Sequence, residues 1–304
     1  MSAASARLDA ELVRRGLARS RGRAAALVAQ GSVRVGGVVA RKASQPVPEA
    51  AALSVVPNEE TEYVSRAAHK LAGALDAIDA LVPGALRPAG ARCLDAGAST
   101  GGFTQVLLER GAAHVVAVDV GHDQIAPVVA ADPRVTVREG VNVRRLSPQD
   151  VGGPVDLVVA DLSFISLTVV LPALVGAVAP GGNLLLLVKP QFEVGRQRLG
   201  ASGVVTSPAL REEAVRNVAE AAGDLGGTLR AVVPSGLPGP AGNHEYFVWL
   251  TPGTASPVDG TGLGDAAAQS VRDAVRLAVR DAVRLAVRDD VATLVGAATV
   301  RSIR

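Results

Sequence analysis

The stretch Leu94-Asp-Ala-Gly-Ala-Ser-Thr-Gly-Gly-Phe103 decides the fold of this 304-residue chain. It begins inside a predicted strand over residues 92–96, and it ends in residues 102–110, whose pattern predicts a helix. Glycines at such a strand-to-helix turn let the backbone bend sharply and approach a ligand closely. The first amide groups of the helix face that ligand. The stretch therefore predicts a ligand-binding turn at the carboxyl end of a strand.

Residues 58–251 continue this alternation of strand and helix patterns. Strands are expected at residues 92–96, 114–118, 135–138, 155–160, 184–188, 229–233 and 245–250. Helical patterns lie between most of them, for example over 102–110 and 208–222. This order predicts an α/β domain of Rossmann-like fold, with a mostly parallel, seven-stranded sheet covered by helices on both faces. The runs at 157–160 and 184–188 are apolar throughout, as expected of central strands.

Residues 1–57 are much more basic than the rest of the chain. The whole chain has a formal net charge of +2, yet residues 1–48 hold nine Lys and Arg against two acidic residues, a local net charge of +7. The pattern predicts a small α+β domain, with two short helices before a small sheet. Such basicity indicates a polyanion such as RNA as the partner, and a solvated charged surface is the alternative. The arginines expected to bind RNA are Arg7, Arg14, Arg15, Arg19, Arg21 and Arg23.

Residues 252–304 are expected to be a linker and a low-complexity amphipathic helical tail. Glycine and proline are frequent up to residue 264, and the octad Val-Arg-Asp-Ala-Val-Arg-Leu-Ala then occurs at 271–278 and again at 279–286. Valine and arginine each recur every four residues, which places them on slowly drifting helical stripes. We expect truncation after residue 264 to leave folding and activity largely intact, because this region holds no candidate catalytic residue.

Composition disfavours several classes of protein. Cys93 is the only cysteine, which excludes a disulfide framework and a multi-cysteine metal site, and we expect no bound metal. Residues 162–188 carry no charge, but Pro172 and the turn residues 180–183 interrupt them, so we expect no membrane span. The chain opens without the pattern of a signal peptide. We therefore expect a cytoplasmic protein.

Two carboxylates suggest which ligand the glycine turn binds. Asp119 ends the next strand, 24 residues after Asp95, where a carboxylate can accept hydrogen bonds from both hydroxyls of a ribose. The turn has the form Gly97-x-x-x-Gly101-Gly102, which is not the dinucleotide pattern, and Asp95 lies two residues before its first glycine. A pyrophosphate would be repelled by that carboxylate, whereas the positive sulfonium of S-adenosylmethionine tolerates it. S-adenosylmethionine is therefore favoured over a nicotinamide dinucleotide, and a turn without a ligand is the third interpretation.

Four segments of the chain together resemble a known family. They are Tyr63 to Leu71, Leu94 to Phe103, Asp161 to Leu167, and Lys189-Pro-Gln-Phe-Glu193 with Gly242-Asn-His-Glu245-Tyr. The chain resembles the TlyA family of ribosomal-RNA ribose 2′-O-methyltransferases, whose names are often haemolysin-like and whose catalytic half is FtsJ-like. Its basic segment resembles the RNA-binding domain of a small-subunit ribosomal protein. The resemblance implies an S-adenosylmethionine-dependent RNA methyltransferase that acts on ribosomal RNA or ribosomal subunits.

The resemblance also implies a catalytic set of four residues: Lys70, Asp161, Lys189 and Glu245. Two of the chain's three lysines belong to this set, whereas the chain has 28 arginines. A buried lysine beside carboxylates can orient a ribose hydroxyl and help remove its proton. We expect Lys189 to take that proton, Asp161 to orient Lys189, and Lys70 with Glu245 to position the ribose. Asp161 and Lys189 also follow apolar strands, at the edge where open α/β sheets bind ligands.

The expected cofactor-binding residues are Asp95, Gly97, Ser99, Thr100, Gly101, Gly102, Phe103, Asp119 and Asn142. Two places depart from the family pattern. His122 and Asp123 stand in a run where Gly-Tyr-Gly-Gln-Leu is expected, and Val141 stands where a polar residue is expected. These departures bear on cofactor affinity rather than on the type of reaction. Two other classes of function stay open, a membrane-active haemolysin-like protein and a non-catalytic RNA-binding factor for ribosome assembly.

Overall fold

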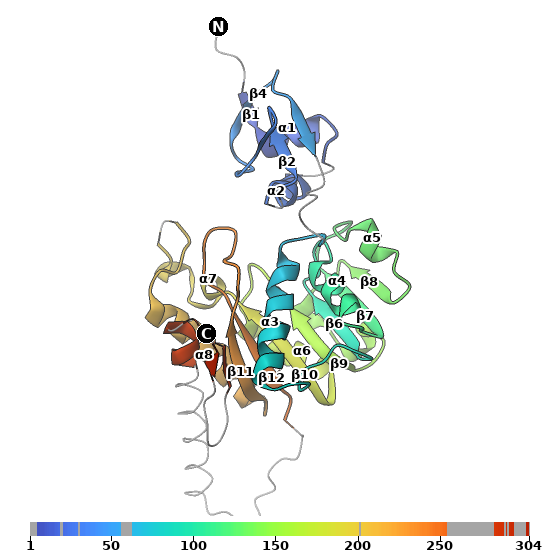
Figure 1. Cartoon of the computed structure of the whole chain (residues 1–304), viewed down its shortest axis with the longest axis vertical. Coiled ribbons are helices and arrows are strands. Elements are labelled where there is room, and N and C mark those ends of the chain that lie inside the picture. Colours follow the sequence, from blue (N-terminus) through green and yellow to red (C-terminus); the bar gives the residue numbers. More distant parts are fainter. Residues whose placement is uncertain are drawn as a thin grey trace, which may run out of the picture. The chain divides into compact units, whose positions relative to one another are not determined.

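The computed structural model describes residues 5–18, 21–29, 31–55, 63–200, 202–253, 283–288, 290, 292–294 and 302–303. The chain divides into two compact units, Met1–Arg66 and Ala67–Arg304 (Figure 1). We call them the N-terminal unit and the C-terminal unit, and each is described by itself.

The N-terminal unit is built from short helices and short strands. Its elements are β1 (Ser5–Arg7), α1 (Leu8–Arg14), α2 (Arg21–Ala29), β2 (Val33–Val35), β3 (Val38–Val39), β4 (Pro46–Pro48) and β5 (Leu53–Val55). The two helices pack together, β1 pairs with β4, and β3, β2 and β5 form a separate antiparallel sheet. Leu8, Leu12, Val28, Val33 and Val47 are among the buried residues of its core. The expected small α+β domain is confirmed.

A large sheet forms the centre of the C-terminal unit. All seven expected strands are present: β6 (Arg92–Ala96), β7 (His114–Asp119), β8 (Val135–Glu139), β9 (Val155–Ala160), β10 (Val178–Val188), β11 (Thr228–Pro234) and β12 (Tyr246–Thr251). Among them the order is β11-β12-β10-β9-β6-β7-β8. Neighbours from β10 to β8 run parallel, and β12 runs antiparallel to both β10 and β11. The expected Rossmann-like fold with a mostly parallel sheet is therefore confirmed.

Helices cover both faces of this sheet (Figure 1). They are α3 (Ala67–Leu81), α4 (Gly102–Glu109), α5 (Pro127–Ala130), α6 (Leu167–Ala177), α7 (Pro190–Glu193) and α8 (Pro208–Asp224), with short 3-10 turns η1 (Val143–Arg145), η2 (Pro148–Val151) and η3 (Arg196–Arg198). Strand residues alternate between faces. Leu94, Val158 and Leu186 share a core with α6 and α8. On the opposite face of the sheet, the ring of Phe247 lies 6.0 Å from that of Phe103 in α4.

The strand order reverses beside β6, which locates the binding edge of the sheet. From β6 the chain proceeds to β7 and β8 on one side, and it then crosses to β9 and β10 on the other side. Ligands of open α/β sheets bind outside the carboxyl ends of the strands at such a reversal. The turn after β6 and the segments after β9 and β10 therefore meet at one edge.

The described residues after 282 pack against the rest of the C-terminal unit, which differs from the separate tail that the repeat predicts. β13 (Ala292–Leu294) pairs with β11, and β14 (Ser302–Ile303) pairs with β13, so nine described strands form the sheet where seven were expected. Val283 and Val287 are buried in the core that contains α6 and α8. Their four-residue spacing places them on one helical stripe, and the edge of β11 offers backbone hydrogen bonds. Most of the octad repeat lies outside the described residues.

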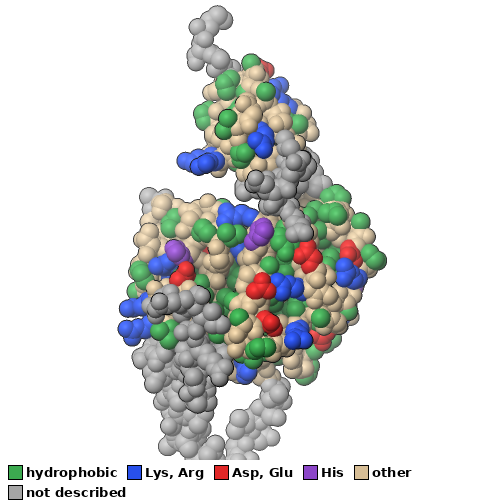
Figure 2. Space-filling model, in the orientation of Figure 1, with side chains coloured by type: hydrophobic (Ala, Val, Ile, Leu, Met, Phe, Trp, Pro, Cys, Tyr) green, Lys and Arg blue, Asp and Glu red, His purple; other side chains and the backbone are tan. Residues whose placement is uncertain are grey.

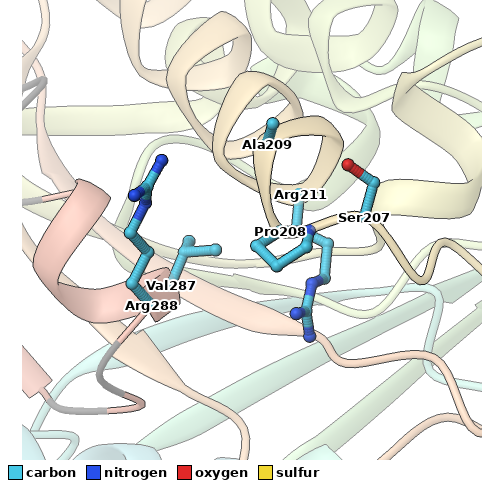
Figure 3. A pocket seen from close by; sticks show the side chains of 6 residues that line it. All are labelled: Ser207, Pro208, Ala209, Arg211, Val287 and Arg288. Atoms are coloured by element: carbon cyan, nitrogen blue, oxygen red, sulfur yellow. The ribbon is translucent and has the colours of Figure 1, made fainter.

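A cavity lies between this C-terminal segment and the start of α8 (Figure 3). Its lining residues are Ser207, Pro208, Ala209, Arg211, Val287 and Arg288. The Nε atom of Arg288 lies 3.4 Å from Oε2 of Glu212, so the two charges are paired. The cavity lies where the C-terminal segment packs against α8. None of the expected cofactor or catalytic residues lines it.

Candidate active site

The turn between β6 and α4 brings the backbones of two central strands close together. Gly97 has a φ of +86°, and a Cβ at this position would lie 2.6 Å from the carbonyl oxygen of Asp161, after β9. Gly101 has a φ of +92° and begins α4, and a Cβ there would lie 2.9 Å from Val129. Glycine is required at both positions, since another residue would be strained and would collide. Of the other expected turn residues, Ser99 is exposed, and the buried ones are Thr100, Gly102 and Phe103.

Asp95 places a fully buried carboxyl group under this turn. The Thr104 hydroxyl donates a hydrogen bond of 2.7 Å to its Oδ2 atom, while Oδ1 is buried without a hydrogen-bond partner among the described residues. Burial raises the pKa of Asp95 to about 7. A buried acceptor without a donor is costly, and a cationic ligand would relieve that cost. The site therefore fits the positively charged end of S-adenosylmethionine.

Asp119, at the end of β7, ties two loops together. Its Oδ2 atom accepts a hydrogen bond from the Ser99 amide at 2.8 Å, and its Oδ1 atom accepts one from the Gly121 amide at 2.7 Å. Each carboxylate oxygen has a second lone pair, so Asp119 can still accept hydrogen bonds from a ribose. Asn142 is exposed after β8, and its side chain accepts a hydrogen bond from the Arg144 amide at the start of η1. Asn142 therefore stabilises this loop through the hydrogen bond from its side chain to the Arg144 backbone.

The first lysine of the expected catalytic set forms a buried ion pair. Lys70, in the first turn of α3, places its Nζ atom 2.5 Å from Oε2 of Glu245, which immediately precedes β12. Both side chains are almost fully buried. The Glu245 Oε1 atom is buried without a hydrogen-bond partner among the described residues. That atom lies against Gly239, where a Cβ would be 2.5 Å away, so the pair joins α3 to the start of β12 inside the protein.

The second lysine pairs with Asp161 at the carboxyl ends of two central strands. Asp161 follows β9 and Lys189 follows β10, and Nζ of Lys189 lies 2.6 Å from Oδ1 of Asp161. The same Nζ atom donates a hydrogen bond of 2.8 Å to the hydroxyl of Ser163. The Lys189 and Asp161 side chains are 11% and 15% exposed, so both can be reached from solvent. This pair is less buried than Lys70–Glu245.

Strand register joins the two ion pairs and the glycine turn. Val188 lies opposite Tyr246, which places Lys189 next to Glu245 across β10 and β12. The Asp161 amide donates a hydrogen bond to the Ala96 carbonyl oxygen at 3.1 Å, which places Asp161 beside the turn. The four residues expected from the resemblance therefore meet at one edge of the sheet, next to the expected cofactor turn.

Three contacts near this edge were missed from sequence. Phe164 is 90% exposed with a φ of +66°, and its ring lies 5.3 Å from that of Phe192. Ser163 binds Lys189, as described above, and Glu193 binds the start of α6. Both Phe164 and Glu193 lie within the segments that carry the resemblance, but no pattern in the sequence indicates what they contact. The exposure of Phe164 leaves its ring free to contact a ligand.

Two acidic residues bind the arginines of the N-terminal unit, where Figure 2 shows Lys and Arg side chains on the visible face. Asp9 accepts hydrogen bonds from Arg7 and Arg21, and the Arg7 guanidinium, followed by Arg21, holds the pKa of Asp9 well below its usual range. Glu11 accepts hydrogen bonds from Arg14 and Arg15, which lower its pKa to about 2. Of the remaining expected RNA-binding residues, Arg19 and the side chain of Arg23 lie outside the described residues.

Arg15 has a further structural role in this unit. Its guanidinium donates hydrogen bonds to the carbonyl oxygens of Ala51 and Glu49 at 2.6 Å and 2.7 Å. Its side chain is 22% exposed, against 57% for Arg14. Arg14 is therefore better placed than Arg15 to contact a phosphate.

The described residues contain neither a membrane-spanning helix nor a cluster of metal-binding side chains. None of the described helices is long and apolar enough to cross a membrane. Within the same residues, no group of three His, Cys, Asp or Glu side chains is arranged to hold a metal ion.

Comparisons with known proteins agree with this geometry. Residues 63–251 match the FtsJ-like methyltransferase family, and residues 6–51 match the S4 domain. The chain is 54% identical to the 16S/23S rRNA (cytidine-2′-O)-methyltransferase TlyA of Mycobacterium tuberculosis, over 88% of this chain and 97% of that protein. It is 33% identical to Hemolysin A of Brachyspira hyodysenteriae, over 79% of this chain and 98% of that protein.

A solved structure gives the same result for both units. A protein of Streptococcus thermophilus that carries a hemolysin name is 31% identical, with a TM-score of 0.65, and the match covers 93% of this chain and 95% of the other. The chain therefore belongs to the TlyA family of RNA methyltransferases, with an S4 domain ahead of an FtsJ-like methyltransferase domain.

Proposed function

We propose that this protein transfers a methyl group from S-adenosylmethionine to a ribose 2′-hydroxyl of ribosomal RNA. The observation that carries the proposal is the meeting of the glycine turn with the Lys189–Asp161 pair. A Cβ on Gly97 would lie 2.6 Å from the Asp161 carbonyl oxygen, so a ligand in the turn would lie next to the paired lysine. The relative from Mycobacterium tuberculosis, named as a methyltransferase of cytidine in 16S and 23S rRNA, supports a cytidine target.

The described residues fit the proposed cofactor. The Oδ1 atom of Asp95, which has no hydrogen-bond partner among the described residues, would accept a hydrogen bond from the ammonium group of its amino-acid end, and Asp119 would accept hydrogen bonds from its ribose. When bound, S-adenosylmethionine supplies an electrophilic methyl group attached to a positively charged sulfur. The chain itself supplies the orientation and the proton transfer.

Lys189 is proposed to activate the ribose hydroxyl. Of the three N–H bonds of its ammonium group, one is donated to Ser163 and one faces Asp161, so one remains for the 2′-oxygen. To accept a proton, Lys189 must first release one to solvent, which its partial exposure permits. The neutral amine then takes the hydroxyl proton, and the 2′-oxygen becomes the nucleophile. Asp161 holds the amine in place throughout.

The other pair is proposed to hold the ribose in position. Glu245 keeps its Oε1 atom without a hydrogen bond among the described residues, while Lys70 fixes the opposite oxygen at 2.5 Å. The pair joins α3 to the start of β12 beside Lys189, so its loss would misplace the group that meets the reacting oxygen. Phe164 is proposed to stack on the base of the target nucleotide, because single-stranded RNA bases are held by aromatic rings. The exposed ring beside the ion pair supports this role.

The N-terminal unit is proposed to hold the RNA through its phosphates. The side chains of Arg7, Arg14 and Arg21 are more than half exposed, although each binds a carboxylate. Contacts of this kind position a nucleic acid without reading its sequence. A ribosomal RNA substrate also implies a cytoplasmic location.

Mass mapping of ribosomal RNA from cells with and without the gene tests the proposal. We expect one or more ribose methyl groups to disappear with the gene and to return when the intact gene, but not its Lys189→Arg variant, is supplied. Identical ribosomal RNA in both cell types would contradict the proposed function. Vesicle leakage caused by the purified protein would instead favour the haemolysin alternative.

A further inference from the structure

Side chains of the segment after β10 contact the segment after β9 and the start of α6. We call them the β9 loop, residues 161–166, and the β10 loop, residues 189–193. Lys189 contacts Asp161 and Ser163 at one end of this junction. The ring of Phe192 contacts that of Phe164 further along. Glu193 forms the last contact.

Glu193 holds the far end of the β9 loop with both carboxylate oxygens. Its Oε2 atom accepts a hydrogen bond from the Ser166 hydroxyl at 2.5 Å, and its Oε1 atom accepts one from the Leu167 amide at 2.8 Å. Ser166 is the N-cap of α6, and Leu167 is its first residue. The first amide groups of a helix lack partners within the helix, and a carboxylate near them is favoured by the helix dipole. Glu193 therefore caps α6 from a different element of the fold.

This cap has a direct path to the proposed catalytic groups. Lys189 is the N-cap of the short helix α7 and Glu193 is its last residue, and four residues separate Ser166 from Asp161. Phe164 lies two residues before Ser166 with a φ of +66°, a backbone conformation that persists only where the surroundings enforce it. The two hydrogen bonds of Glu193 fix the chain on one side of this residue. The cap thus sets the position of both the ion pair and the exposed ring.

We infer that Glu193 is a positioning residue for methyl transfer, which holds the β9 and β10 loops in the register that pairs Lys189 with Asp161 and presents Phe164. The inference rests on the proposed function. It makes a selective claim, because Asp95 lies in β6, Gly97 in the turn after β6 and Asp119 at the end of β7, all outside the two loops. Loss of the cap should therefore slow the chemical step and leave cofactor affinity unchanged.

The test compares four purified full-length proteins: the wild type, Glu193→Ala, Glu193→Gln and Glu220→Ala. Glu220 is an exposed glutamate of α8 and serves as the matched control. The measurements are the single-turnover rate of RNA methylation at saturating RNA and S-adenosylmethionine, the Kd for S-adenosylmethionine by calorimetry, and the melting temperature. Glutamine can still accept from the Leu167 amide and exchange a hydrogen bond with Ser166, so it should restore the cap.

We expect Glu193→Ala to slow the single-turnover rate by about tenfold to a hundredfold, the scale of a displacement of up to about 1 Å. Glu193→Gln and Glu220→Ala should stay within about threefold of the wild-type rate, and all Kd values should agree within about twofold. A Glu193→Ala rate within about twofold of wild type would overturn the inference, whatever its melting temperature. A Glu193→Gln rate as low as that of the alanine variant would overturn it as well.

A second variant decides the case in which Glu193→Ala does not fold. Ser166→Ala removes the hydrogen bond to Glu193 together with the contacts of the same hydroxyl to Thr168, and it leaves the Leu167 contact. We expect its rate to fall about threefold to tenfold with unchanged cofactor affinity. An unchanged rate would overturn the inference. Failure of the wild type to methylate RNA would refute the proposed function, and with it the role of Glu193. This outcome is distinguished from the others because the wild type is measured first.

Discussion

The two units of this protein both pair basic with acidic side chains, but at different depths. In the N-terminal unit, Asp9 and Glu11 hold arginines whose guanidinium groups reach the surface, with Arg14 57% exposed. In the C-terminal unit, Glu245 and Asp161 hold lysines in or near the core. Exposed pairs contribute little to stability, whereas buried charges cost desolvation. We propose that the outer pairs orient cations toward a polyanion and that the inner pairs serve the chemistry.

The residue types fit this division. An arginine presents several N–H donors in a planar fork, so it can bind a carboxylate on one side and a phosphate on the other. A lysine can lose its proton when its surroundings favour the neutral amine, which arginine does not do in proteins. Two of the three lysines of the chain lie in the inner pairs. The comparison therefore predicts that replacing a lysine by an arginine lowers activity in the inner pairs but not at exposed positions.

The largest expected effect is at Lys189. Lys189→Arg keeps the positive charge but removes a group that can accept a proton, so the single-turnover rate of methyl transfer should fall at least about a hundredfold. The affinity for S-adenosylmethionine should barely change. Lys42→Arg, at an exposed lysine of the N-terminal unit, is the matched control and should keep the wild-type rate. Near-normal turnover of Lys189→Arg would show that Lys189 supplies only charge.

A smaller effect is expected from the pH dependence of cofactor binding. Burial raises the pKa of Asp95 to about 7, so its carboxyl group is mostly protonated at pH 6 and mostly ionised at pH 8. A cationic ligand favours the ionised form, and its affinity should therefore rise about tenfold from pH 6 to pH 8. Asp95→Asn should bind more weakly and lose this dependence. Calorimetric titrations at several pH values check it, and equal slopes for both proteins would contradict it.

The same raised pKa has the opposite sign for folding. The folded protein binds the Asp95 proton more tightly than the unfolded chain, so this group's contribution to stability falls as the pH rises from about 4 to about 7. Asp95→Asn should remove that loss in urea unfolding curves measured without cofactor.

The outer pairs are tested by comparing two neighbouring arginines. Arg14→Ala should weaken RNA binding severalfold and reduce the slope of log affinity against log salt by up to about 0.9 on duplex-like sites. Arg15→Ala should change this slope less and lower the melting temperature more, because Arg15 donates to two backbone carbonyl oxygens. Salt titrations of RNA binding measure both slopes. If both variants lose the same slope, exposure does not decide which arginine contacts phosphate.

The smallest effect on function is expected from a change that touches no charge pair. Val283 is fully buried against the core of the C-terminal unit, and Val283→Ala should lower the free energy of unfolding by about 1–2 kcal/mol. Methyl transfer and RNA binding should stay at wild-type levels. In the same way, truncation after residue 264 should lower the melting temperature, contrary to the expectation from the repeat alone. An unchanged melting temperature in both proteins would show that the segment adds no stability.

The central strands could be predicted closely from the sequence. The expected strands at 92–96 and 155–160 coincide with β6 and β9. The second contains the run 157–160, which is apolar throughout, as is typical of strands buried on both faces. The short strand β4 begins and ends with proline and has no such run, and it was missed. β13 and β14 were also missed, since their pairing depends on the distant edge of β11 rather than on any local pattern.

The site could be predicted only in part. Asp95, Asp161 and Lys189 are recognisable as polar residues at or just after the ends of apolar strands. The partnership of Lys70 with Glu245 joins residues 175 positions apart, and no spacing in the sequence indicates it. The resemblance supplied that pair. The contacts of Ser163, Phe164 and Glu193 depend on how two loops meet, and they required coordinates.

The central claim is methyl transfer to a ribose 2′-oxygen, and alkaline hydrolysis of methylated RNA tests it most directly. The purified protein is incubated with ribosomal RNA and methyl-labelled S-adenosylmethionine, and the RNA is then digested completely with alkali. A 2′-O-methyl group blocks attack on the adjacent phosphodiester, so the account predicts that the label remains in alkali-resistant dinucleotides and is lost with Lys189→Arg. Label in single nucleotides would place the methyl group on a base and contradict the account, as would a fully labelled product from the variant.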